Sequence, residues 1–194
     1  MVPAETLCIK LEVFAQMLAH LQSSESENLY LILEIADSIS ENNPSVHAAL
    51  TNCLENTAVY AETHTERYAE RGIDVKNCDR DTFCWIAMVD ELEASGDVVG
   101  IDSSSYLEDF LWAVQQLRTA QGVDFSSLHL LEDSDVYEWY AVCNAFLKEK
   151  GMLFCGIDID SDDTEVILVT TAVYDKISML AKRVGHRIVP AETL

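Results

Sequence analysis

The sequence predicts an α+β fold, with a helical N-terminal third, then helix–strand units, a C-terminal β-hairpin and a last helix. Three observations predict it. Apolar residues recur at helical spacing through residues 5–72, amphipathic segments that end at glycine precede short β-rich runs, and two such runs enclose an acidic turn. Because 194 residues fit one domain, we expect a single domain over residues 1–194, with its α+β part at about 79–188.

The first two helices are expected on either side of a polar link over residues 23–27. The segment 5–22 places five apolar side chains on one helix face: Leu7, Leu11, Phe14, Leu18 and Leu21. The second helix is apolar along one side and is expected to end at about Ser40.

A third helix is expected from about Ser45 to Arg71. Pro44 suits the start of this helix, because proline is favoured in a first turn. Gly72 suits its end, because glycine adopts the left-handed conformation that closes many helices.

The second part of the chain repeats a helix–glycine pattern. Its amphipathic segments, 81–96, 108–122 and 135–151, start with acidic residues, end at glycine and each carry one tryptophan, Trp85, Trp112 or Trp139. These tryptophans are expected in the core, with Trp139 as the candidate for a partly exposed anchor. Short strands are expected after two of these glycines, at residues 98–101 and 152–159.

The C-terminal region is expected to hold a hairpin and a helix. Residues 152–159 and 165–171 are β-rich and flank the acidic turn 160–164, which is typical of a hairpin. The last helix, 173–184, belongs to the one basic segment of the chain.

The sequence Val-Pro-Ala-Glu-Thr-Leu occurs twice, at residues 2–7 and again at 189–194. A tandem array, a circular rearrangement and a cloning artefact would each produce it. We favour a repeat or cloning boundary, which places the end of the folding unit near Ile188 and predicts a loose tail over residues 189–194.

The chain carries a formal net charge of −22, and its cations are unevenly spread. No Lys or Arg lies between Lys10 and Arg67, or between Asp81 and Leu117. Such a field repels nucleic acid and anionic membrane and attracts basic proteins. We therefore expect a basic protein partner, with neither nucleic acid nor membrane as a ligand.

A cytoplasmic location is expected. No apolar run approaches the ~18 residues of a membrane span, and no signal peptide is evident. The six cysteines are irregularly spaced and form no C-x-x-C pair, which favours buried free thiols in a reducing compartment.

Residues 83–188 carry an ordered set of structural motifs. A Phe-Cys-Trp helix ends at Gly96, Gly100-Ile101-Asp102 follows, and then come a helix containing Trp112, the segment 135–151 and the hairpin that starts at Gly156. This order resembles a family of uncharacterised bacterial domains of unknown function. The resemblance implies an α+β fold and brings no activity with it. By size and charge alone the chain is also similar to bacterial immunity proteins.

The densest group of carboxylates is Asp158, Asp160 and Asp162, which matches the start of a calcium-binding loop. The match then fails, because Asp163 stands where the loop needs glycine and Val169 where it needs glutamate. Two interpretations stay open: a metal site of an enzyme or regulator, and a solvated strand face with a hairpin turn. We predict no cofactor.

No catalytic signature stands out. The chain lacks a phosphate-binding glycine loop and an H-E-x-x-H motif. Cys143 could be paired with His129 or His186 as a thiol nucleophile, but it lies inside an apolar helical segment, where core packing is expected. These absences favour a protein that is not an enzyme.

The leading hypothesis is a binding protein of the immunity type, whose acidic helices dock a basic partner. Its candidate contacts are the acids of the cation-free N-terminal segment and one tryptophan set beside an acid: Glu25, Glu27, Glu34, Asp37, Glu41 and Trp139. The alternatives are a metal-dependent enzyme or regulator, a DNA-mimic inhibitor, and a homo-oligomer in which the basic segment 176–187 meets an acidic face.

Overall fold

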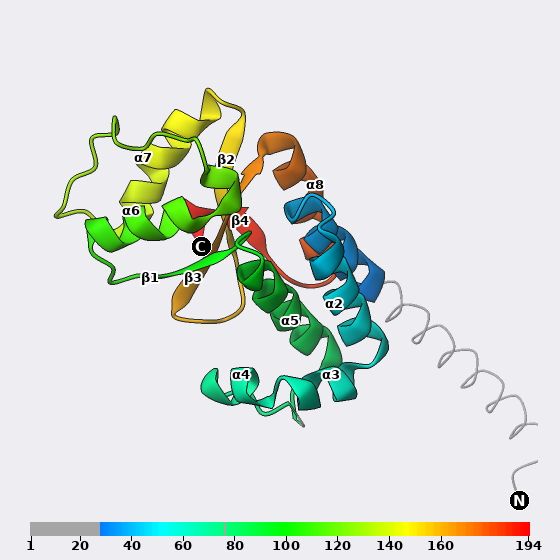
Figure 1. The fold of residues 1–194 in the computed structure, drawn as a ribbon. Coiled ribbons are helices and arrows are strands. Elements are labelled where there is room, and N and C mark those ends of the chain that lie inside the picture. Colours follow the sequence, from blue (N-terminus) through cyan, green and yellow to red (C-terminus); the bar gives the residue numbers. More distant parts are fainter. Residues whose placement is uncertain (1–27, 76) are drawn as a thin grey trace, which may run out of the picture.

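The computed structural model describes residues 28–75 and 77–194 and has the α+β fold that the sequence predicts. Figure 1 shows a four-stranded sheet between two layers of helices. The strand order is β1-β3-β2-β4 and every neighbouring pair is antiparallel. The strands are β1 (Val99–Asp102), β2 (Met152–Ile157), β3 (Asp163–Thr170) and β4 (Ile188–Pro190).

The sheet is buried on both faces. Successive side chains of a strand point to opposite faces, so Ile167 joins one hydrophobic cluster and Leu168 the other. The same alternation separates Cys155 from Phe154 on β2. The apolar residues of the central strands therefore form continuous runs, Met152–Cys155 in β2 and Val166–Val169 in β3.

One face is covered by the helix over residues 28–39 and by α2 (Pro44–Glu55), α5 (Arg80–Ala94) and α8 (Thr171–Arg183). We call this set, together with α3 (Thr57–Thr63) and α4 (Thr65–Glu70), the first layer. The predicted start of α2 is confirmed, because the Asn43 side chain accepts a hydrogen bond from the Ser45 N–H.

The predicted third helix is three helices: α2, α3 (Thr57–Thr63) and α4 (Thr65–Glu70). The expectation of one helix to Arg71 was wrong because the backbone leaves helical geometry at Asn56 and His64. The breaks turn α3 and α4 across the N-terminal half of α5, where Tyr60 and Tyr68 contact the ring of Phe83.

The other face is covered by α6 (Leu107–Gln116), the short 3₁₀ helix η1 (Arg118–Ala120) and α7 (Val136–Lys148), which form the second layer. The helix expected to reach Gly122 ends at Gln116 because Leu117 takes an extended conformation. The glycines predicted to follow α5 and α7 are confirmed in left-handed geometry, with φ of 77° at Gly96 and 67° at Gly151.

Residues 189–194 are part of the fold, so the expected loose tail is corrected. Val189 lies in β4 and pairs with Gly156 of β2, and Ala191 is buried in η2 (Ala191–Thr193). Beyond the end of β4, the Asn144 side chain forms the hydrogen bonds that a neighbouring strand would form with β2. It donates to the Phe154 carbonyl and accepts from the Phe154 N–H. The tail therefore completes the sheet edge.

Several expectations lie outside the described residues: the helix at 5–22, the first copy of the repeated hexapeptide, and the contacts Glu25 and Glu27. Of the helices in the described ranges, none combines the length and the apolar character needed to cross a bilayer.

Candidate functional site

The predicted acidic contacts of the first layer are paired within the chain. Glu34 lies 2.9 Å from the Lys176 ammonium, and Asp37 lies 2.9 Å from Nδ1 of His47. Glu41 makes a 2.9 Å ion pair with Arg118. These three carboxylates already have neighbours of opposite charge or hydrogen-bond donors, so the predicted contacts Glu34, Asp37 and Glu41 are compensated within the chain.

The aspartate cluster forms the hairpin turn. β2 ends at Ile157, so Asp158, which the prediction placed in the strand, lies outside it. One Asp158 oxygen accepts from the Asp160 N–H at 3.1 Å, and the other lies 3.2 Å from Arg187. Asp162 also lies in this turn, and the described residues contain no group of three side chains placed to hold a metal ion. The Asp158 carboxylate therefore stabilises the turn.

Two tryptophans exchange the places that the sequence suggested for them. Trp139 is 2% exposed, and its Nε1 donates to the Leu131 carbonyl at 2.7 Å, so the expectation of an exposed anchor there was wrong. Trp112, expected in the core, is 66% exposed. The periodicity of α6 carried this signal, because its apolar positions at helical spacing leave 112 off the buried stripe: Leu107, Phe110, Leu111, Val114 and Leu117.

The exposed face of α6 gathers large apolar groups and acids. Tyr106, at its N-cap, is 76% exposed, and Trp112 follows on the helix face shared with Glu108 and Asp109. Beside them lies a hollow of about 390 Å³. The hollow is lined by Tyr106, Leu107, Glu108, Leu111 and Glu132. We call these residues, with Asp109 and Trp112, the α6 patch.

The acids of the α6 patch differ from Glu34, Asp37 and Glu41 in having no ion-pair partner among the described residues. Glu108, Asp109 and Glu132 form no ion pair with any described residue. The next cation along the chain, Arg118, is held by Asp97 at 2.8 Å and by Glu41. The α6 patch is therefore an aromatic surface with an uncompensated negative rim.

A second group of charges lies inside the first layer, where Arg71 binds three carboxylates from two other elements. Its guanidinium is 2.8 Å from Asp90, 3.4 Å from Glu93 and 3.4 Å from Glu165 of β3. Next to it, Arg67 pairs with Glu91 at 2.9 Å. This cluster fastens α4 to α5 and to the sheet.

Burial controls the protonation of the two inner carboxylates, Asp90 and Glu165, which are each 3% exposed. Burial raises the pKa of Glu165 to about 7, and the Arg71 guanidinium opposes this shift. Burial also raises the pKa of Asp90, again against Arg71. One guanidinium thus holds an acidic pair that retains a proton more readily than exposed carboxyl groups do.

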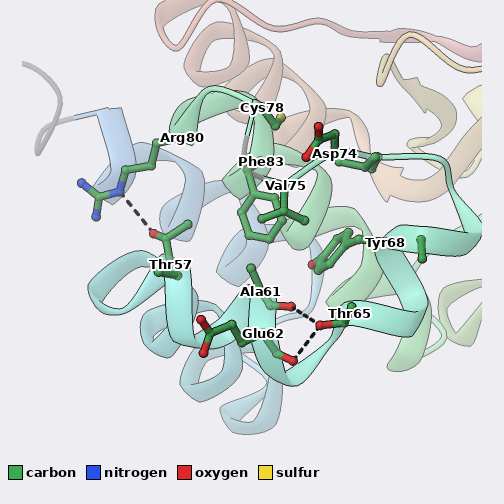
Figure 2. Close-up of a pocket in the computed structure, with 13 residues that line it drawn as sticks. Thr57, Ala61, Glu62, Thr65, Tyr68, Asp74, Val75, Cys78, Arg80 and Phe83 are labelled. Atoms are coloured by element: carbon green, nitrogen blue, oxygen red, sulfur yellow. Dashed lines mark hydrogen bonds between the residues drawn. The ribbon is translucent and has the colours of Figure 1, made fainter.

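A cavity of about 570 Å³ lies between α3, α4 and the start of α5 (Figure 2). Its walls are mostly apolar and include Ala61, Ile73, Val75 and Phe83. No sequence pattern predicts this cavity, because it depends on the two breaks that turn α3 and α4.

The comparisons with known proteins identify a family without a known activity. No curated protein and no solved structure is significantly similar to the chain. A family profile described as a domain of unknown function, DUF6630, matches residues 31–191, which include the helical part as well as the α+β part. Since this match covers most of the chain, the protein belongs to the family of domains of unknown function designated DUF6630.

Proposed function

We propose that this protein is a non-enzymatic, cytoplasmic binding protein that docks a basic protein partner through its α6 patch. The observation that carries the proposal is the exposure of Trp112 and Tyr106 on a surface whose acids form no ion pair with a described residue. Free thiols at all five described cysteines support a reducing compartment: Cys53, Cys78, Cys84, Cys143 and Cys155.

The α6 patch has the two components that a binding site for a basic protein needs. Tryptophan and tyrosine are the residues that most often dominate binding energy at interfaces, because they bury a large area with few rotatable bonds. Exposed carboxylates speed the encounter with a cationic surface and make it dependent on salt. Arginine and lysine side chains also bind the faces of aromatic rings.

An immunity protein that neutralises a cationic toxin is the concrete form of this proposal. Size, acidity and the α+β fold support it by analogy. A DNA-mimic inhibitor would use the same acids against a nucleic-acid-binding protein, and the two forms differ in whether DNA competes for the partner.

The test is affinity capture from the native host's lysate, with the intact chain and with Trp112→Ala. Tyr30→Ala is the matched control, because Tyr30 is a similarly exposed aromatic on the helix over residues 28–39. The captured protein is then purified and titrated against each variant by calorimetry at low and high salt.

The expected result is a basic protein that binds the intact chain and Tyr30→Ala equally, binds Trp112→Ala at least roughly tenfold more weakly, and dissociates as salt rises. Equal binding by Trp112→Ala would contradict the α6 patch as the docking site. An acidic partner would contradict the electrostatic basis. Displacement by duplex DNA would identify the DNA-mimic form, and a dimer in light scattering that Trp112→Ala abolishes would replace the partner by a second copy.

A further inference from the structure

The cavity between α3, α4 and α5 is a second site, separate from the α6 patch and on the other side of the sheet. Its volume of about 570 Å³ lies within the range of small-molecule sites, roughly 300–1,000 Å³. It is also lined by residues from four consecutive segments of chain, so it is a formed hollow rather than a groove along one helix.

The base of the cavity is rigid and aromatic. Tyr68 and Phe83 are both almost completely buried, and their rings lie 4.7 Å apart between centroids. Val75 and Ala61 extend this wall (Figure 2). Such a wall favours a ligand with an apolar body.

The described residues on the rim of the cavity carry net negative charge. They include two carboxylates, Glu62 and Asp74, and one guanidinium, Arg80. The Glu62 carboxylate forms no ion pair with a described residue, whereas Asp74 accepts a hydrogen bond from the Asn77 side chain at 2.6 Å.

The guanidinium of Arg80, on the rim of the cavity, is hydrogen-bonded within the chain. Its Nε donates to Thr57 Oγ1 at 3.2 Å, and its Nη2 donates to the Leu54 carbonyl at the end of α2. Figure 2 shows this side chain directed away from Phe83 and Val75. Arg80 therefore ties α5 to the junction of α2 and α3, and its positive charge lies at the edge of the cavity, away from the apolar wall.

We propose that this cavity binds a small organic cation with an apolar, preferably aromatic, body and a protonated amine. The apolar walls take the body, and the Glu62 carboxylate, with Asp74 on the same rim, takes the ammonium group. A carboxylate of the same shape would approach two rim carboxylates on a chain of net charge −22. A neutral alcohol would gain only the burial of its apolar part.

The test uses three fluorescent probes with one common body: 1-naphthylmethylamine, 1-naphthalenemethanol and 1-naphthoate. Each is titrated against the intact chain at neutral pH, with fluorescence anisotropy as the readout. We expect saturable binding of the amine, weaker binding of the alcohol and no saturable binding of the carboxylate. An alcohol that binds as tightly as the amine, or an amine that does not bind, would overturn the proposal.

Glu62→Gln separates the charge from the cavity. This substitution should lower the affinity for the amine by roughly two- to fivefold and leave the affinity for the alcohol unchanged, because an exposed ion pair contributes about 1 kcal/mol or less. An equal loss for both probes, or no loss for either, would contradict the assignment of Glu62.

Two tryptophan variants on α3 test the location. Ala58 lines the cavity, so Ala58→Trp should obstruct it and lower the affinity for the amine at least tenfold. Val59, its exposed neighbour, does not line the cavity, so Val59→Trp should leave affinity within twofold. Equal affinity of the two variants for the amine would overturn this site. Circular dichroism at both positions distinguishes obstruction from loss of fold.

Discussion

The Arg71 cluster of the first layer and the α6 patch of the second layer differ in how their carboxylates are compensated. In the cluster, one guanidinium reaches the buried acids Asp90 and Glu165, and at the edge of the same layer Lys176 reaches Glu34. The α6 patch presents acids with no ion-pair partner among the described residues. Cations thus compensate the acids that the fold buries, whereas the α6 patch leaves its carboxylates available to a partner.

Removing Arg71 should produce the largest loss, because it breaks the compensation of the first layer. Arg71→Ala leaves Asp90 and Glu165 buried without their cation, and loss of one partner of a buried pair costs about 3–5 kcal/mol. Arg187→Ala, which breaks an exposed pair with Asp158, is the control and should cost less than about 1 kcal/mol. Urea unfolding measures both, and similar losses would contradict the contrast.

Substitution of the two tryptophans of the second layer should change the free energy of unfolding by very different amounts. Trp139→Ala empties a buried site against Phe110 and should lower the free energy of unfolding by about 3–5 kcal/mol. Trp112→Ala removes an exposed side chain and should change it by less than about 0.5 kcal/mol. A large loss at Trp112 would show that this ring supports the fold rather than a partner.

The buried acids should make the first layer sensitive to pH. Because the pKa of Glu165 rises from 4.5 to about 7 on folding, the folded chain binds more protons than the unfolded chain between these values. Its contribution to stability is complete below pH 4.5 and is lost as pH rises through 7, and Asp90 acts with the same sign. The free energy of unfolding should fall between pH 5 and 8 more steeply in the intact chain than in Glu165→Gln, by on the order of 2–3 kcal/mol.

Denaturation at a series of pH values measures this difference. Because the two chains differ only at position 165, the general effect of net charge largely cancels between them. Parallel pH profiles would mean that Glu165 is ionised throughout the range.

Exposed acids should give the smallest effects and still distinguish the layers. Glu34→Gln removes an ion pair with Lys176 and should lower stability by roughly 0.2–1 kcal/mol, less at high salt. Glu132→Gln removes an acid without an ion-pair partner and should leave stability unchanged or slightly raise it. Thermal denaturation at two salt concentrations checks both variants. An equal loss of stability at the two positions would contradict the difference between an ion-paired and an unpaired acid.

Local signals were sufficient for much of the fold. The start of α7 is fixed by Asp135, whose side chain accepts from the Glu138 N–H at 2.9 Å, and its end is followed by the left-handed Gly151. Both features stand in the sequence within a few residues of the helix, as do those of the hairpin. Such elements can be predicted because each signal acts on its own neighbourhood.

The helix breaks that create the cavity were missed because their local cause is weak. The Thr57 hydroxyl donates to the Cys53 carbonyl at 2.8 Å, and the Thr65 hydroxyl donates to the Glu62 carbonyl at 2.8 Å. Such bonds compete with helical ones only slightly, and tertiary contacts decide the outcome. The α6 patch was missed for another reason: the helical period marks Trp112 as exposed, but aromatic character alone suggested burial.

The tail could not be foreseen from its own residues. Three residues of β4 join β2 through pairing between positions far apart in the sequence, and no local pattern announces such a contact. The repeated hexapeptide even suggested a boundary there. The strand order also depends on pairing between distant positions, so it could not be predicted from local patterns either.

The short strands at the two sheet edges bear on how the protein behaves at high concentration. β1 has four residues, and β4 has three and contains Pro190, which has no N–H to offer to another strand. Next to β4, the Asn144 side chain occupies the backbone groups of Phe154. A sheet with such an apolar centre would be a template for amyloid-like stacking if its edges were open. With these edges shortened and capped, the chain should resist strand-to-strand aggregation even where salt screens its charge.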